Sequence, residues 1–367
     1  MEVCKVIRIF KTNYTKDKID FRMEAAMNEL SLPTDKMREG GIIPKIGAHE
    51  HFDVYQEDPA INSLEELAAK KIGKESSLFV ASGTMGNLIA VLTHCIRGDE
   101  VILEAGAHML YYEVGGMSAL GGVLPRTIVG NRGIITPKQI EEALFGENVF
   151  FRKTKLICLE NPHNQAGGSI IPLKIMEDVY QIAHQHNIFI HLDGARIFNA
   201  AVALDVDVSV VAKYSDSVMF CLSKGLGVPI GAILSGSKEF IEKAKKYRQM
   251  LGGVMRQAGI LAASGIIALE TMVDRLKEDQ ENAWILGEGL NKIRGIEVNL
   301  ETVQTNMVYI NIKKLGMDTF EFLKKLLKFN ILASPRGFTE VRFLTHFGIS
   351  REDIYKTIKS IEEIAKK

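Results

Sequence analysis

The sequence predicts an α/β fold, with a large domain built on a mostly parallel, doubly wound sheet and a smaller C-terminal α/β domain. Short β-branched runs alternate with helical stretches through much of the chain, which is typical of parallel strands joined by helices. These strand-like runs are apolar at consecutive positions, so helices are expected on both faces of the sheet. The pattern changes near Gly252, where a long helical stretch leads into shorter strands.

The predicted elements of the large domain follow one another in a regular order. Residues 76–96 are expected to form a strand, a turn of small residues and an amphipathic helix. Further elements are predicted as strands at 100–105, 154–160, 187–195 and 215–223, and as helices at 172–187 and 207–215. This alternation favours strands that run in the same direction.

The smaller domain is expected to begin with one long helical segment at 256–295. Short strands are predicted at 296–301, 305–312, 331–335 and 340–346, together with two helices, of which the second covers 350–367. No flexible linker separates the two parts, so they are expected to pack together. We place an N-terminal extension at 1–24, the large domain at 25–250 and the small domain at 251–367.

Composition restricts the class of partner. The chain has 45 basic and 45 acidic residues, so no electrostatic argument favours a nucleic acid or a membrane surface, and a small-molecule partner is expected. The four cysteines lack CxxC spacing, as in reduced cytosolic proteins. The N-terminal apolar piece is too short for a signal peptide and no run is long enough to span a membrane, which predicts a cytoplasmic protein.

Several polar residues stand where predicted strands end. Ligands of open α/β sheets gather outside the carboxyl ends of the strands, so these residues are expected to converge on one site. The turn Ser82, Gly83 and Thr84 precedes a helix, whose first backbone N–H groups attract anions such as phosphate. Taken alone, such a turn is more often an ordinary helix cap.

Asp193, Arg196 and Lys224 follow two of the predicted buried strands. A carboxylate beside a buried strand needs a partner, and pairing with Arg196 would be a purely structural explanation of Asp193. Lys224 lies between Ser223 and Gly225 and is a candidate for a lowered pKa and Schiff-base chemistry. Pyridoxal phosphate requires three groups together. An anion site binds its phosphate, a carboxylate partners its ring nitrogen, and an amine holds its aldehyde.

Six segments carry a resemblance to a known family, at 53–88, 159–168, 191–204, 217–227, 250–259 and 341–346. From about Leu32 to the C-terminus, the chain resembles the low-specificity L-threonine aldolases, which belong to the aspartate-aminotransferase-like pyridoxal-phosphate enzymes. The resemblance implies the type I pyridoxal-phosphate transferase fold. It also implies retro-aldol cleavage of L-threonine or L-allo-threonine to glycine and acetaldehyde.

The resemblance implies roles for the residues that bind the cofactor. Lys224 would form the aldimine with pyridoxal phosphate, and Asp193 would partner the ring nitrogen. The phosphate would contact Ser82, Gly83, Thr84 and Arg256, although Arg256 could instead cap a neighbouring element. His108 matches the histidine that stacks on the cofactor ring.

The remaining roles concern the substrate. Arg196 would lie near the ring's phenolic oxygen or the substrate carboxylate, and Arg342 would pair with the α-carboxylate. His163 matches a histidine near the substrate hydroxyl, and the base could be His163, His108 or an ordered water. Either histidine could instead be structural. No metal is assigned.

The N-terminal part departs from the family pattern. A serine that helps to bind substrate in the family aligns with Met27, which leaves substrate affinity and preference open. His49 and His51 alternate as on one face of a strand, but no further ligand accompanies them, so loop variation explains them better than a metal site.

Two other classes of function stay open. A β-eliminating lyase or an aminotransferase would use the same lysine and aspartate, and would release a keto acid with ammonia or exchange an amino group. A non-catalytic relative would bind the cofactor without turnover. The protein is expected to be a homo-oligomer, either a dimer or a tetramer.

Overall fold

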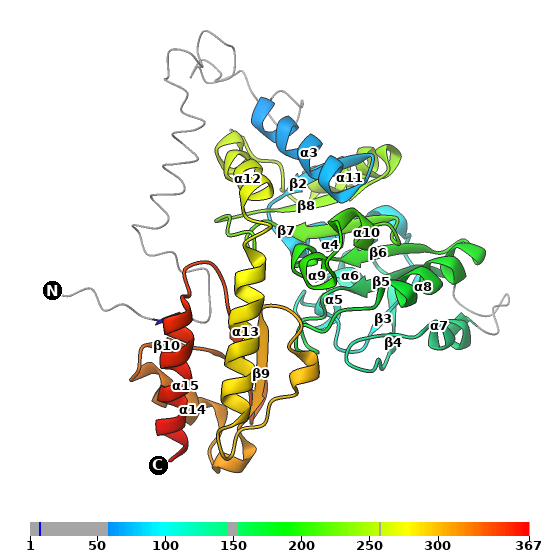
Figure 1. The fold of residues 1–367 in the computed structure, drawn as a ribbon. Coiled ribbons are helices and arrows are strands. Elements are labelled where there is room, and N and C mark those ends of the chain that lie inside the picture. The colour runs from blue at the N-terminus through cyan, green and yellow to red at the C-terminus, as the bar shows by residue number, and fades with distance from the viewer. Residues whose placement is uncertain (1–6, 9–57, 145–152, 257, 367) are drawn as a thin grey trace, which may run out of the picture.

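The computed structural model describes residues 7–8, 58–144, 153–256 and 258–366. Its largest feature is a seven-stranded sheet, with a smaller α/β unit beside it (Figure 1). The strands of the large sheet are β2 (Ser76–Val80), β3 (Glu100–Glu104), β4 (Leu124–Ile128), β5 (Thr154–Glu160), β6 (Phe189–Asp193), β7 (Ser217–Cys221) and β8 (Ala232–Gly236).

The strands are arranged in the order β2-β8-β7-β6-β5-β3-β4. Strand β8 is antiparallel to β2 and to β7, and the other neighbouring pairs are parallel. The non-sequential order means that helical connections carry the chain from one parallel strand to the next. The predicted fold class, an α/β protein with a mostly parallel doubly wound sheet, is confirmed.

Helices cover both faces of the sheet. Phe79 of β2 packs into one hydrophobic core, whereas its neighbours Leu78 and Val80 pack into another. The core that contains Phe79 is covered by α3 (Pro59–Ile72), α7 (Pro137–Leu144), α8 (Leu173–Gln185), α9 (Ile197–Leu204), α10 (Val208–Ala212) and α12 (Gly259–Thr271). The opposite face is covered by α4 (Gly83–His94), α5 (His108–Tyr111), α6 (Gly116–Ala119) and α11 (Lys238–Met250).

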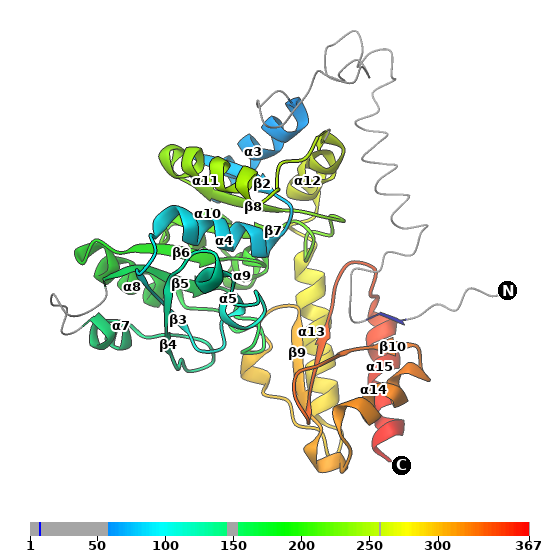
Figure 2. The ribbon, with the colours of Figure 1, turned by 180° about the vertical axis from the view of Figure 1, so that it is seen from behind.

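The smaller unit has its own sheet and core. Strands β11 (Ser334–Pro335), β12 (Glu340–Leu344) and β9 (Met307–Asn311) form an antiparallel sheet in that order, while β10 (Ile331–Leu332) pairs with β1 (Ile7–Arg8). Helices α13 (Leu276–Asn291), α14 (Thr319–Leu327) and α15 (Arg351–Ala365) pack around these strands (Figure 2). Helix α13 contacts α9 of the large unit as well as β9 and α15, and so joins the two units.

Three of the predicted elements differ from the structure. Residues 331–335, predicted as one strand, form the two short strands β10 and β11, which belong to different sheets. Residues 256–295, predicted as one helical segment, form the separate helices α12 and α13. Residues 296–301, predicted as a strand, form only an isolated bridge at Glu297 and the short 3-10 helix η2 (Leu300–Thr302). The side chain of Asn299 accepts a hydrogen bond from the N–H of Glu301 at 3.1 Å, and this local bond favours a turn over a strand.

The domain boundary at residue 250 stays a prediction. Buried residues of α12 belong to the core of the large sheet, where this helix packs against α3 (Figure 1). The proposed N-terminal extension lies outside the described residues except for Ile7 and Arg8. Met27, His49 and His51 also lie outside the described residues.

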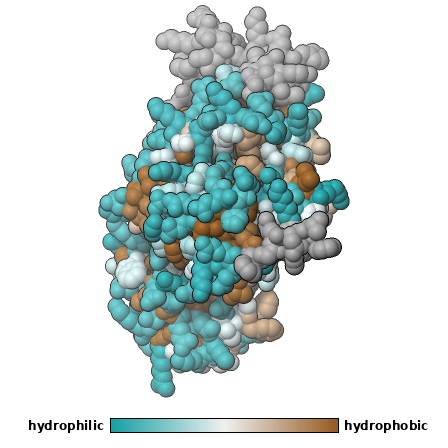
Figure 3. Space-filling view, turned by 90° about the vertical axis from the view of Figure 1, so that its right-hand side faces the viewer, coloured by the Kyte–Doolittle hydropathy of each residue, from teal (hydrophilic) through white to brown (hydrophobic). Residues whose placement is uncertain are grey.

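The surface is mixed in polarity. Figure 3 shows hydrophilic residues over most of one face, with groups of hydrophobic residues between them. Among the residues that the structure describes, each helix is too short or too polar to serve as a membrane span.

Candidate active site

Three of the predicted groups lie at the carboxyl ends of strands in the large sheet. Asp193 is the last residue of β6, Lys224 follows the end of β7 by three residues, and Ser82 precedes α4. The turn that contains Ser82 packs closely on β7, since a Cβ added to Gly83 would lie 2.8 Å from Sγ of Cys221. The structure therefore brings Asp193, Lys224 and the turn to one edge of the sheet.

Lys224 stands on a tightly packed loop. Its carbonyl accepts a hydrogen bond from the N–H of Gly227 at 3.0 Å. A Cβ on Gly225 would come within 2.7 Å of Oδ1 of Asn199, so the position next to the lysine has room only for glycine. Burial raises the pKa of the Cys221 thiol. The Lys224 side chain lies close enough for its charge to oppose that rise.

The turn before α4 is open to an anion. Ser82 caps the helix, and its Oγ accepts a hydrogen bond from the N–H of Met85 at 3.2 Å. The side chains of Ser82 and Thr84 are exposed at the positive end of this twelve-residue helix. Arg256 is also exposed, three residues after Gly253, which packs directly on Met85. Contact between Arg256 and a phosphate stays a prediction.

Asp193 is buried and is held by neutral donors. Its Oδ2 accepts a hydrogen bond from Nδ2 of Asn87 at 2.9 Å, and its Oδ1 accepts one from the N–H of Ala195 at 3.1 Å. Within the part of the chain that the structure describes, Asp193 forms no ion pair with Arg196. Pairing with Arg196, the structural explanation of Asp193, is therefore wrong.

His108 lies at the start of α5 and is fixed by two glutamates. Its backbone N–H donates to Oε2 of Glu160 at 2.7 Å, and its Nδ1 lies 3.1 Å from Oε1 of Glu113. The side chain is 27% exposed, so part of it remains accessible to solvent. Side-chain atoms of His108, Glu113 and Asp193 all lie within 4.8 Å of one another.

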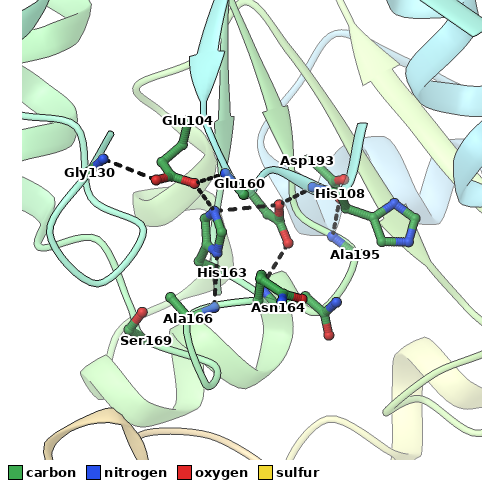
Figure 4. A network of polar contacts seen from close by, with 12 residues as sticks. Glu104, His108, Gly130, Glu160, His163, Asn164, Ala166, Ser169, Asp193 and Ala195 are labelled. Carbon is green, nitrogen blue, oxygen red and sulfur yellow. Dashed lines mark hydrogen bonds and ion pairs between the residues drawn. The ribbon is translucent and has the colours of Figure 1, made fainter. Parts of the chain in front are cut away.

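His163 is buried, and Figure 4 shows its ring between Glu104 and Ala166. Its Nδ1 accepts a hydrogen bond from the N–H of Ala166 at 3.2 Å, and its Nε2 lies 3.1 Å from Oε2 of Glu104. The ring packs so closely on Gly133 that a Cβ there would collide with it. Burial lowers the pKa of His163, but its contact with Glu104 and the charge of Glu160 outweigh that effect, so the pKa is raised. Both ring nitrogens thus face protein groups.

Arg342 of β12 reaches across to the large unit. It donates a hydrogen bond to the side-chain oxygen of Asn164, and the hydroxyl of Tyr309 donates to the Asn164 carbonyl at 2.7 Å. Burial and the nearby charges of Arg196 and Arg336 lower the pKa of Arg342 to about 10. Nε of Arg196 and Nε of Arg336 are buried without a hydrogen-bond partner among the described residues. The charges of Arg196 and Arg336 both act on Arg342, so the three guanidinium groups lie near one another. Contact of Arg196 and Arg342 with a substrate carboxylate stays a prediction.

Several residues of this site were not predicted from the sequence, among them Asn87, Glu113, Asn164, Tyr309 and Arg336. The sequence could have pointed to Asn87, because an amide on the buried side of an apolar helix needs polar partners. Asn164 stands next to His163, which the family pattern marked. Arg336 directly follows the predicted strand at 331–335, but an arginine at the end of one short strand does not by itself indicate a site.

The fold and the site together define an α/β protein whose candidate site lies at the carboxyl ends of its parallel strands. A family model described as beta-eliminating lyase matches residues 29–313. The chain therefore belongs to the beta-eliminating lyase family, and the predicted family resemblance is confirmed.

Similar proteins carry more specific names. Low-specificity L-threonine aldolase 1 of Arabidopsis thaliana is 43% identical over 336 residues, which cover 90% of this chain and 93% of that protein. The low specificity L-threonine aldolase of Escherichia coli strain K12 is 36% identical over 337 residues, with 92% and 96% covered. The structure of Leishmania major threonine aldolase shares the fold with a TM-score of 0.74 at 18% identity, covering 90% of this chain and 95% of that one.

Proposed function

We propose that the chain is a pyridoxal-phosphate-dependent aldolase that cleaves L-threonine and L-allo-threonine to glycine and acetaldehyde. The observation that carries the proposal is the placement of Asp193, Lys224 and the turn at Ser82 on one edge of the sheet. The names of the Arabidopsis and Escherichia coli relatives support the reaction.

The residues present fit the cofactor. The exposed turn at the start of α4 would hold the phosphate, and Lys224 would hold the aldehyde carbon covalently. Asp193 is bonded by neutral groups alone among the described residues, so its negative charge is available for a protonated ring nitrogen. When bound, the cofactor supplies an electron sink for the pair that is released as Cα–Cβ breaks.

The protein groups would bind the substrate and move its protons. Arg342 and Arg196 lie near each other and would bind the α-carboxylate. His108 is the better candidate for the base, because its side chain is 27% exposed, whereas His163 is buried and both of its ring nitrogens face protein groups. The base would take the proton of the substrate hydroxyl as the aldehyde carbonyl forms.

The name of the family suggests a second reaction, β-elimination. A β-eliminating lyase would remove the hydroxyl group of threonine as water, and would release a keto acid and ammonia. The same lysine and aspartate serve both reactions, so the products decide between them.

The test is product analysis with purified protein, pyridoxal phosphate and either L-threonine or L-allo-threonine. We expect equal amounts of glycine and acetaldehyde, and none from Lys224→Ala run in parallel. Release of a keto acid with ammonia would favour β-elimination. Binding of the cofactor without any product would favour a non-catalytic relative.

We also propose that the protein works in the cytoplasm as a dimer or tetramer. Cys95, Cys158 and Cys221 are buried and free, as in reducing compartments. The segment after His108 exposes Tyr111, Val114 and Leu120, which would be covered if a second copy packed there. Light scattering of the purified protein measures the number of subunits.

A further inference from the structure

A chain of buried polar groups lies beneath the site, where α4 packs on β6 and β7. Nδ2 of Asn87 donates hydrogen bonds to Oδ2 of Asp193 at 2.9 Å and to Oε1 of Glu113 at 2.8 Å. Oδ1 of Asn87 lies 3.0 Å from Nε2 of His191. All four residues are buried, so each group would destabilise the protein if it were left unpaired.

The direction of each hydrogen bond follows from the partners. Carboxylate oxygens accept, so the part of Asn87 that faces Asp193 and Glu113 is its NH₂ group. Its oxygen then accepts from Nε2 of His191, and Nδ1 of His191 accepts from Oγ of Ser217 at 2.9 Å. Burial lowers the pKa of His191 to about 4, so near pH 7 the ring carries the single proton that this arrangement requires.

Asn87 connects two arms of the site. One arm is Asp193, the proposed partner of the ring nitrogen. The other is Glu113, whose Oε1 also lies 3.1 Å from Nδ1 of His108, the proposed base. A single amide group therefore bonds to the carboxylates of both arms.

We propose that Asn87 is a positioning residue for the aldolase reaction, which fixes Asp193 directly and His108 through Glu113. The proposal rests on the function proposed above. Without the NH₂ group of Asn87, two buried carboxylates share no donor and repel each other. His108 then loses the orientation that Glu113 gives it, although neither residue has been changed.

The test compares Asn87→Ala with Asn306→Ala in protein loaded with pyridoxal phosphate. Asn306 is a matched control, because it is equally buried and its Nδ2 donates to the carbonyl of Thr345 at 2.8 Å in the smaller unit. We expect Asn87→Ala to lower kcat for L-threonine roughly 10- to 100-fold with KM changed less than about threefold. The absorption band of the bound cofactor should also shift. Asn306→Ala should lose stability but keep both kcat and the band.

A double-mutant cycle tests the path through Glu113. Glu113→Gln keeps the shape of the side chain and removes its charge, and we expect it to lower kcat about 10-fold. The double variant Asn87→Ala/Glu113→Gln should lose clearly less kcat than the product of the two single losses, because both substitutions act on His108.

Three results would overturn the proposal. The first is a folded Asn87→Ala protein with unchanged kcat and an unchanged band, as a purely structural role would give. The second is a double variant whose loss of kcat equals the product of the two single losses. The third, decisive if Asn87→Ala does not fold, is an unchanged kcat in Glu113→Gln. Failure of the wild-type protein to release acetaldehyde would contradict the proposed function instead, while the absorption band would still test Asn87.

Discussion

Arg342 of β12 donates a hydrogen bond to the side-chain oxygen of Asn164, which follows β5 in the large sheet. The neighbours of Arg342 in the strand, Val341 and Phe343, are fully buried in the core of the smaller unit. The alternation of the strand therefore turns Arg342 toward the large unit, as the sequence EVRFLTH predicts. An arginine between the two units is well placed to bind a substrate carboxylate.

Arg342→Lys should raise KM for L-threonine and leave the cofactor absorption band in place. Lysine keeps the positive charge but cannot form two parallel hydrogen bonds with a carboxylate. A charged hydrogen bond contributes about 1.5–3 kcal/mol, so KM should rise roughly 10- to 150-fold. Normal binding of threonine, or loss of the cofactor instead, would make Arg196 the better candidate for the carboxylate contact.

Asp193→Asn should keep the fold and some cofactor but lose most of its activity. An amide cannot stabilise the proton on the ring nitrogen, so kcat should fall about 100-fold or more. Steady-state kinetics and far-UV circular dichroism measure the two properties separately. Unchanged turnover would show that Asp193 serves only to hold Asn87 and the N–H of Ala195.

His108 and His163 should respond differently to substitution. His108→Asn should lower kcat about 100-fold with little loss of stability, because its ring is accessible and is the proposed base. His163→Gln should mainly lower Tm, since the buried Glu104 loses its partner. Kinetics and thermal unfolding of both variants check this, and a larger loss of kcat in folded His163→Gln would restore His163 as the base.

His191 should make the folded state sensitive to acid. Its folded-state pKa of about 4 lies below the ordinary value of 6.5, because burial disfavours the charged ring. As pH falls, His191 is protonated in the unfolded chain before it is protonated in the folded protein, which favours unfolding. The contribution of the neutral ring to stability is therefore complete above pH 6.5 and is lost as pH falls toward 4. The loss can reach about 1.4 kcal/mol per pH unit. The free energy of unfolding in urea should depend less on pH between 6.5 and 4 in His191→Gln than in the wild type. An equal dependence in both proteins would contradict the lowered pKa of His191.

Local patterns explain why much of the site could be predicted. Apolar runs that end in a polar residue mark strand ends, and this pattern alone predicts that Asp193 and Lys224 lie at one edge of the sheet. Alternation in a short strand likewise predicts the direction of Arg342. These signals depend only on neighbouring residues in the chain.

The remaining features depend on residues that are distant in the sequence. Asn87 contacts Asp193 across 106 positions, and no local pattern reveals which carboxylate an amide will meet. The antiparallel direction of β8 could not be predicted for a similar reason, because a buried strand has the same composition in either direction. His163 matches a family pattern, but its enclosure between Glu104 and Ala166 is visible only in three dimensions.

The most direct test of the central claim is to reduce the cofactor-loaded protein with borohydride and to map the labelled peptide by mass spectrometry. The account predicts a pyridoxyl group on Lys224 and on no other lysine, because this side chain follows β7 at the edge where Asp193 and the turn at Ser82 meet. A pyridoxyl group on a different lysine would contradict the proposed site.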